Sequence, residues 1–92
     1  MNRNMMYDYL KSIGMYPVIH RRKVGYHVEF RKDYRKNQTI EGIILDWGYV
    51  RGFDSIHLCR DEIVLEALDS KINIKYKSIE KFEVIIYEDE DE

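Results

Sequence analysis

The chain has 92 residues, of which 45% are hydrophobic and 35% charged, and these values fit one soluble globular domain but not two. No apolar run approaches the roughly 18 residues that cross a bilayer, no secretory signal precedes the domain, and Cys59 is the only cysteine, so we expect a cytoplasmic protein without membrane contact. The net charge of −2 divides unevenly, because residues 1–36 carry +6 and residues 37–92 carry −8, and such a split favours an electrostatic partner.

The first predicted element is a helix over about residues 4–14. The apolar side chains that recur there at helical spacing are Met5, Met6, Tyr9, Leu10 and Ile13. Asn4 is the expected N-cap, and Gly14 stands where a left-handed residue would end the helix. A helix this short is marginal in water, so its apolar stripe must pack against the rest of the domain.

After Pro17 the apolar period changes to two, which predicts strands. The first covers residues 24–30, in which the residues expected to face the core alternate with those expected to face the solvent. The core-facing residues are Val24, Tyr26, Val28 and Phe30, and the others are Gly25, His27, Glu29 and Arg31. The other predicted strands cover residues 39–47, 55–59, 61–69, 71–76 and 81–87. Residues 61–69 also show helical spacing, so a short helix stays an alternative there, and a single turn is expected at residues 78–80.

Gly42 marks a change of phase within the strand at residues 39–47. Glycine inside a strand often marks a bulge or a sharp bend, and we expect one here. Trp47 continues the apolar face of this strand and is therefore expected to be buried, as is Phe53. The alternative is that Trp47, Tyr49 and Phe53 form with Arg51 an exposed platform on which nucleic-acid bases stack. Residues 48–54 contain two glycines and predict a loop.

Together these elements predict a mainly β domain of the α+β class. A short helix precedes five or six strands of a strongly bent antiparallel sheet, which we expect to close as a small barrel over residues 1–87. Residues 88–92 are five consecutive acids, which repel one another and predict a disordered, solvated tail.

Two segments resemble Sm-like and SH3-like small barrels. Residues 40–44, Ile-Glu-Gly-Ile-Ile, are similar to the glycine-centred bend in the second strand of Sm-like proteins. Residues 71–85, KINIKYKSIEKFEVI, look like the last two strands of the Hfq family of bacterial RNA chaperones. They look equally like the Rho-inhibiting Rof proteins and the YolD-like domains. The resemblance implies a bent barrel, and it divides the expected function between RNA binding and protein binding.

The resemblance to the Hfq family does not extend to its RNA site. In that family the penultimate strand ends in a Tyr-Lys-His sequence that helps bind uridine-rich RNA inside a ring. Tyr76 and Lys77 match this sequence, but Ser78 stands in place of the histidine. Neither the RNA site nor the ring assembly is therefore carried over to this chain.

Basic residues cluster at both ends of the predicted strand at residues 24–30. They are Arg21, Arg22 and Lys23 before it, and Arg31, Lys32, Arg35 and Lys36 at and beyond its end. A strand of this length spans about 20 Å, so these residues form two clusters and not one patch. Either cluster could contact the phosphates of RNA or DNA, and the alternative is a solvated strand entry and turn.

Two further segments are candidates for contact with a partner. Tyr49 and Arg51 lie between two glycines of the predicted loop, so we expect them to be exposed and able to contact protein or nucleic acid. The acids of the tail are Glu88, Asp89, Glu90, Asp91 and Glu92. They either solubilise the chain, fold back on the basic segment, or mimic phosphates in the basic groove of a partner enzyme.

The sequence contains no signature of catalysis. A glycine-rich phosphate loop, a nucleophile elbow and a zinc-protease helix are all missing. His57, Cys59 and Asp61 share one strand face and carry zinc-binding atoms, but a structural zinc site needs a fourth ligand and no second cluster exists. We therefore predict no metal, no cofactor and no enzymatic activity.

The sequence thus predicts a binding module. The leading hypothesis is contact with a host or cognate protein, for example as a phage or mobile-element inhibitor of a host nucleic-acid enzyme. The alternative is direct binding of RNA or DNA through residues 21–36 and the loop with Tyr49 and Arg51. A structural subunit of a homo-oligomer is the third hypothesis.

Overall fold

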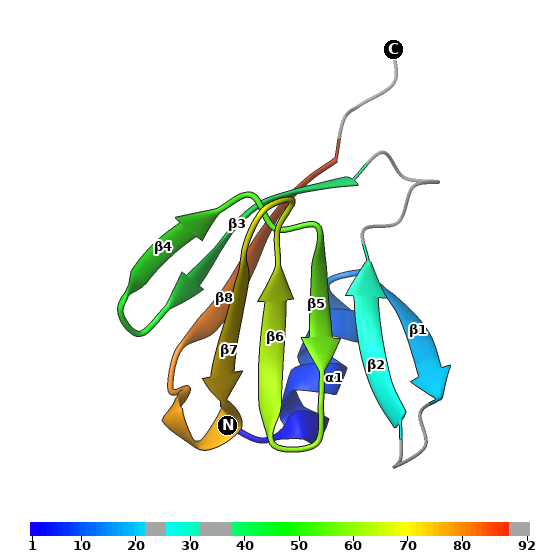
Figure 1. The fold of residues 1–92 in the computed structure, drawn as a ribbon. Helices are drawn as coiled ribbons and strands as arrows, with labels where there is room; N and C mark the ends of the chain where they lie inside the picture. Colours follow the sequence, from blue (N-terminus) through cyan, green and yellow to red (C-terminus); the bar gives the residue numbers. More distant parts are fainter. Residues whose placement is uncertain (22–25, 32–37, 89–92) are drawn as a thin grey trace.

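The computed structural model describes residues 1–21, 26–31 and 38–88, which form a mainly β domain with one short helix (Figure 1). The elements are α1 (Arg3–Ser12), β1 (Tyr16–Arg21), β2 (Tyr26–Arg31), β3 (Gln38–Leu45), β4 (Gly48–Arg51), β5 (Ser55–Leu58), β6 (Glu62–Glu66), β7 (Lys71–Lys75), the 3-10 turn η2 (Tyr76–Ser78) and β8 (Phe82–Glu88). The predicted helix-first, antiparallel β architecture is confirmed.

The strands form two sheets and not a barrel. The larger sheet has the order β1-β2-β5-β6-β7 and the smaller sheet has the order β4-β3-β8, and neighbouring strands in both are antiparallel. Within the described residues no ladder joins the two sheets, so the predicted closed barrel is wrong. Closure would need a bent strand that pairs in both sheets, and each strand here pairs within one sheet.

The bend that we expected at Gly42 is a β-bulge inside β3. The register with β8 shifts there, because Ile40 pairs with Ile86 while Gly42 pairs with Ile85, which leaves Glu41 as the extra residue. The bulge moves the buried phase of β3 from even positions, at Gln38 and Ile40, to odd positions, at Ile43 and Leu45. The predicted irregularity is confirmed, but all of β3 still pairs with β8, so the bulge does not carry the strand into the other sheet.

Helix α1 packs against both sheets and holds them together. Its buried residues are Met6 and Leu10, four positions apart on one face. The Tyr7 ring lies edge-on to Phe30 of the larger sheet, with 5.3 Å between the ring centroids. On the other side, the Val84 backbone N–H of β8 donates to the Tyr9 hydroxyl at 2.9 Å. Sheet edges that expose free N–H groups invite pairing, and Tyr9 covers this one.

The N-cap of the helix lies two residues earlier than predicted. Asn2 is in an extended conformation and its side chain accepts a hydrogen bond from the Met5 backbone N–H at 2.9 Å, so Asn2 and not Asn4 is the cap. Met5 is 55% exposed, although the sequence placed it on the packed face. At the other end, Gly14 has φ +86° and its N–H donates to the Lys11 carbonyl, as predicted.

The predicted strands match the structure best in the second half of the chain. Strands β5, β7 and β8 lie where the sequence predicts them, and residues 62–66 of the ambiguous segment form a strand. The single turn lies at residues 76–78, two positions earlier than expected. Val28 and Phe30 of β2 are buried as predicted. Within the described ranges, no helix has the length and apolar character needed to cross a membrane.

Two strands were not predicted. β1 is an edge strand that contains Pro17 and no fully buried residue, so it lacks the alternation that marks a half-buried strand. β4 lies in the segment that we predicted as a loop, and it too is an edge strand that is mostly exposed. Edge strands bury little, so hydrophobic periodicity identifies them poorly.

Candidate functional site

Trp47 lies at the tip of the β3–β4 hairpin and is 61% exposed, which contradicts the predicted burial. Leu45 pairs with Gly48, so Asp46 and Trp47 form a two-residue turn. The alternation of β3 ends at Leu45, and Trp47 therefore does not continue its buried face. Phe53, by contrast, is buried as predicted.

The hairpin turn is anchored, although its tryptophan is exposed. The Asp46 carboxylate accepts hydrogen bonds from the backbone N–H groups of Glu80, at 2.9 Å, and of Lys81. Hydrogen bonds to an ionised carboxylate are stronger than those between neutral groups. The turn is thus fixed to the segment that precedes β8, and it presents Trp47 from a supported backbone.

The outer face of the smaller sheet carries a group of apolar side chains, which we call the aromatic face: Ile44, Tyr49, Ile85 and Tyr87. Glu83, which pairs with Ile44, and Arg51 lie on the same side of the sheet. These residues lie on the side opposite to the buried positions, with Tyr49 45% and Tyr87 57% exposed. The Tyr49 ring lies over Gly42, where an added Cβ would come within 2.5 Å of the ring. Because Gly42 has no side chain, the Tyr49 ring can pack directly against the backbone of β3 at this position.

Strand β4 is the edge of this sheet beside the aromatic face. The peptide groups of Gly48 and Gly52 point toward β3. Gly48 pairs with Leu45 at the turn, and the Gly52 N–H donates to the Glu41 carbonyl. By the alternation of an antiparallel ladder, the peptide groups of Tyr49 and Arg51 point away from β3. The predicted exposure of both side chains is confirmed.

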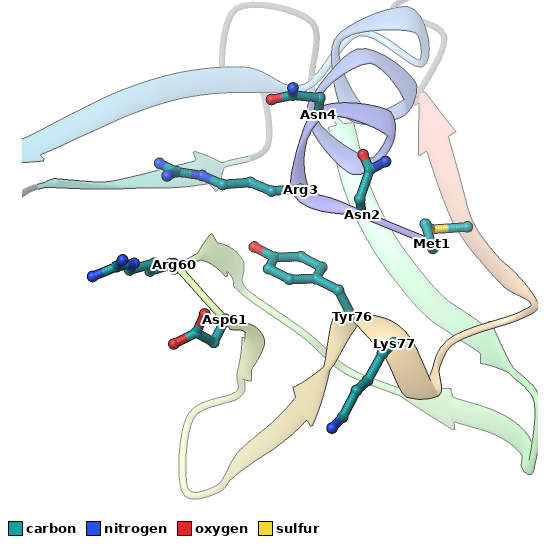
Figure 2. Close-up of a pocket in the computed structure, with 8 residues that line it drawn as sticks. All are labelled: Met1, Asn2, Arg3, Asn4, Arg60, Asp61, Tyr76 and Lys77. Carbon is teal, nitrogen blue, oxygen red and sulfur yellow. The ribbon is translucent and has the colours of Figure 1, made fainter.

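A pocket of about 660 Å³ lies where the start of α1 meets the turn after β5 and the turn η2 (Figure 2). Residues 1–4 line one side, and Arg60, Asp61, Tyr76 and Lys77 line the other. We call it the α1 pocket. No pattern in the sequence indicates this pocket, because its two sides are more than 50 positions apart in the chain.

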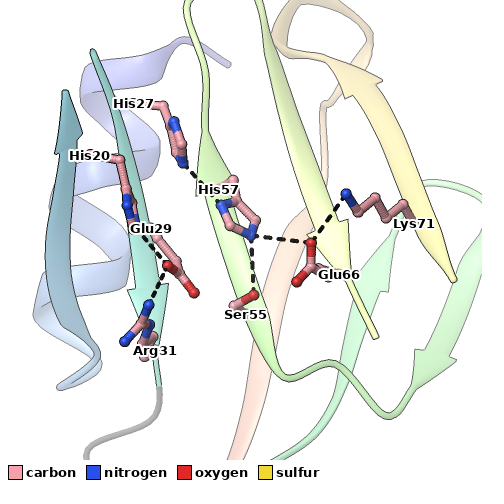
Figure 3. Close-up of polar contacts among 8 residues, drawn as sticks. All are labelled: His20, His27, Glu29, Arg31, Ser55, His57, Glu66 and Lys71. Carbon is pink, nitrogen blue, oxygen red and sulfur yellow. Dashed lines mark hydrogen bonds and ion pairs between the residues drawn. The ribbon is translucent and has the colours of Figure 1, made fainter. Parts of the chain in front are cut away.

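A polar network covers the outer face of the larger sheet (Figure 3). Its first part is centred on Glu29, whose Oε1 accepts from His20 Nε2 at 2.7 Å and from the Arg31 guanidinium at 2.8 Å. In its second part, His57 Nδ1 lies 3.3 Å from His27 Nε2. The rings of His20 and His27 stack with 4.7 Å between centroids, and this contact joins the two parts.

The network continues from His57 toward β7. His57 Nε2 lies 3.2 Å from Ser55 Oγ and 3.7 Å from the Glu66 carboxylate, which in turn lies 3.5 Å from Lys71 Nζ. The hydrogen bond from Arg31 outweighs burial and lowers the pKa of Glu29 to about 2. Burial lowers the pKa of His57, although the carboxylates of Glu29 and Glu66 oppose this shift.

The contacts of this network connect side chains on neighbouring strands of the larger sheet. Ser55 beside His57 has the pairing of an activated nucleophile, but Ser55 is only 4% exposed, so a substrate has little access to its hydroxyl. In the part of the chain that the structure describes, no three His, Cys, Asp or Glu side chains are arranged to hold a metal ion. The network instead ties β1, β2, β5, β6 and β7 together across one sheet face.

Outward faces were predicted for His27 and His57, and His57 was grouped with Cys59 and Asp61, but no contact among His20, His27 and His57 was predicted. Residues 27, 29 and 31 alternate outward along one strand, and so do residues 55 and 57 along another. What was missing is the register: Glu29 pairs with His57 and His20 pairs with His27. Alternation predicts a residue's face, and only the strand order predicts its neighbours.

The predicted basic and acidic sites are described only in part. Arg21 is exposed at the end of β1, and Arg31 pairs with Glu29 at the opposite end of the β1–β2 ladder, so these two lie apart as predicted. Glu88 is the last residue of β8. The remaining predicted site residues lie outside the described ranges: Arg22, Lys23, Lys32, Arg35, Lys36, Asp89, Glu90, Asp91 and Glu92.

Comparison with known proteins adds no family to this description. No family model matches the chain, and neither the curated proteins nor the solved structures include a significant match. The resemblance to Sm-like and SH3-like barrels stays a prediction, because the structure supports only its coarser part, a mainly β antiparallel domain with one helix.

Proposed function

We propose that this chain is a non-catalytic binding module that acts through contact with a partner protein. The observation that carries the proposal is the exposed aromatic face with Trp47 on the turn beside it. Trp, Tyr and Arg are the residue types that most often dominate the binding energy of protein interfaces. Trp47, Tyr49 and Arg51 all lie within five consecutive residues.

The backbone around these side chains supports the proposal. The Asp46 carboxylate fixes the turn through two hydrogen bonds, and the Tyr49 ring packs against Gly42. Because these groups are already held in place, binding would cost little conformational entropy at this surface. The outward peptide groups of Tyr49 and Arg51 could pair with an extended segment of the partner, as sheet edges do in strand addition.

A more specific form of the proposal makes the partner a host nucleic-acid enzyme. It rests on the five acids at residues 88–92, whose charge could occupy a basic groove. Because the chain has a single cysteine, we expect the module to act in a reducing cytoplasm.

Direct nucleic-acid binding is the second candidate. Arg21 is exposed and favours it, but the Arg31 guanidinium at the far end of the same ladder is engaged by Glu29. This candidate predicts a complex with RNA or DNA that weakens steeply as salt rises, by a factor that grows with each phosphate contacted. Gel-shift assays at low and moderate salt would test it, and no shift at low salt would exclude it.

The test of protein binding is affinity capture with point variants. The tagged wild type should retain a defined protein that the variants Trp47→Ala and Arg51→Ala lose, because truncating an interface hot spot costs about 2 kcal/mol or more. Leu68→Ala is the matched control, since Leu68 is 94% exposed on the β6–β7 turn of the larger sheet and is not part of the aromatic face. Equal retention by all variants would reject the proposed surface, and no retained protein would remove the basis of the proposal.

A further inference from the structure

The two sheets end in four edge strands, β1, β7, β4 and β8, and three of these carry a feature that hinders pairing with another chain. β1 contains Pro17, which has no N–H to donate. β7 begins and ends with the exposed residues Lys71 and Lys75. The Tyr9 hydroxyl accepts from the Val84 N–H of β8. β4 has neither proline nor lysine, and in Figure 1 no described element lies outside it.

The sequence of β4 is complementary to itself when two copies run antiparallel. From Gly48 to Gly52 it reads Gly-Tyr-Val-Arg-Gly. If Val50 lies opposite Val50 of a second copy, Tyr49 of each chain lies opposite Arg51 of the other. Gly48 then faces Gly52, and neither adds a side chain that would clash.

The backbone of β4 agrees with this register. The peptide groups of Tyr49 and Arg51 point away from β3, whereas those of Val50 point toward it. Opposite residues whose peptide groups point at each other exchange both their hydrogen bonds, so each Tyr49–Arg51 pair is a hydrogen-bonded pair. A shift of the register places Tyr49 opposite Tyr49 or Arg51 opposite Arg51, which leaves a single such pair within β4. In the second case that pair also brings two like charges together.

The side chains that would face each other also attract. Tyr49 and Arg51 are both exposed on the outer side of the sheet, and Arg51 forms no ion pair with any residue in the described ranges. A guanidinium group is attracted to the electron-rich face of a tyrosine ring. On the inner side, Val50 is partly buried against the core and would contact its own copy.

We propose that β4 pairs with β4 of a second copy of this chain, antiparallel and centred on Val50, so that two three-stranded sheets join into one. The contact is two-fold symmetric and closes at two chains, because each chain has one β4 edge. It involves about three residues of each chain, far fewer than the roughly 20–30 of a stable interface. We therefore expect a dimer that forms at high concentration and separates on dilution.

The dimer does not depend on the proposed partner protein, but it uses the same strand edge. A partner that adds a strand to β4 would displace the second copy. Self-pairing would thus cover this edge in the free protein and expose it when a partner competes for it.

The first test follows association as a function of concentration. The mass measured by sedimentation velocity should rise toward that of a dimer as the protein approaches about 1 mM, the range of weak contacts. Over the same range the amides of Tyr49 and Arg51 should exchange more slowly with solvent, because they become hydrogen-bonded. The Val50 amide already faces β3 and should not change.

The second test determines the register with two variants. Arg51→Glu removes the attraction to the Tyr49 ring, and Tyr49→Lys places a second cation opposite Arg51, so each alone should dimerise less than the wild type. In an equimolar mixture the two new side chains face each other with opposite charge, and the other facing pair is native. Association should therefore recover. Lys77→Glu is the control, since it makes the same charge reversal on the turn η2 and should leave association unchanged.

Three results would overturn the proposal: a chain that stays monomeric at about 1 mM, single variants that associate as strongly as the wild type, and a mixture that does not recover. The first would leave the β4 edge free for a partner. Trp47 lies outside the paired residues, so Trp47→Ala should keep the dimer even though it is expected to lose a captured partner. Failure of the dimer and failure of the proposed function are therefore distinguishable.

Discussion

At the scale of single residues, Glu29 holds the polar network together. It is 7% exposed, and its carboxylate accepts hydrogen bonds from His20 and Arg31 on the same sheet face. A buried carboxylate is stable only while such partners compensate for its lost hydration. The stability of the folded state therefore depends on the ionisation of this carboxyl group.

Glu29→Gln should destabilise the protein near pH 7 and should matter less in acid. The pKa of Glu29 is lowered from 4.5 to about 2, so its charge stabilises the folded state above pH 4.5 and this contribution is lost as pH falls toward 2. The shift corresponds to about 3 kcal/mol of unfolding free energy. Urea unfolding of both proteins at pH 7 and pH 3 measures the difference.

Glu80→Gln is the control, because Glu80 is exposed and contributes only its backbone N–H to the hydrogen bond with Asp46. It should change the unfolding free energy by less than about 0.5 kcal/mol at either pH. If Glu29→Gln costs the same at pH 7 and pH 3, the charge of Glu29 does not carry the stabilisation.

At the scale of elements, the packing of β3 against β4 depends on Gly42. Gly42→Ala should destabilise the protein by about 1–3 kcal/mol, because the new Cβ must displace the Tyr49 ring that now lies over it. In a Tyr49→Ala background the ring is gone and the penalty should largely disappear. Thermal unfolding of the four proteins gives the coupling, and an equal penalty in both backgrounds would refute the contact.

The sequence predicts elements well where one face is buried and the other is not. Apolar and polar residues alternate along the sequence of β5 and β7, and the bulge at Gly42 was expected from the break in alternation around it. The edge strands β1 and β4 were missed, because they bury too little to leave a pattern. The exposure of Trp47 was also missed, since a two-residue turn ends the alternation just before it.

The candidate surfaces were predictable only in part, for a related reason. Tyr49 and Arg51 were expected to be exposed from the glycines that flank them. The polar network and the α1 pocket depend on contacts between residues far apart in the chain, such as Glu29 with His57. Periodicity gives no information about which strands become neighbours, so neither feature could be predicted.

At the scale of the whole molecule, α1 is the element that joins two sheets with no shared strand. Tyr7 contacts the larger sheet through Phe30, and Tyr9 contacts the smaller sheet through Phe82 and Val84. An open pair of sheets leaves edges that a closed barrel would not have. The helix covers the β8 edge, whereas β4 keeps outward peptide groups beside the aromatic face.

Tyr9→Phe should weaken this junction without changing the fold. The Val84 N–H loses its acceptor, which should cost about 1 kcal/mol and speed the hydrogen exchange of that amide. Tyr7→Phe is the matched control, because it keeps the ring contact with Phe30 and removes no hydrogen bond that holds β8. Equal exchange of Val84 in wild type and Tyr9→Phe would contradict the proposed junction.

We propose that Trp47 and the aromatic face form one exposed surface for a protein partner. Trp47 is the only tryptophan, so labelling with 5-fluorotryptophan gives one fluorine NMR signal even in a mixture with unlabelled protein. In the free protein this signal should move between light and heavy water, as expected for an exposed ring. Adding the captured partner should shift the signal and abolish its solvent dependence. A signal that lacks solvent dependence in the free protein, or that stays unchanged when the partner is added, would contradict the claim.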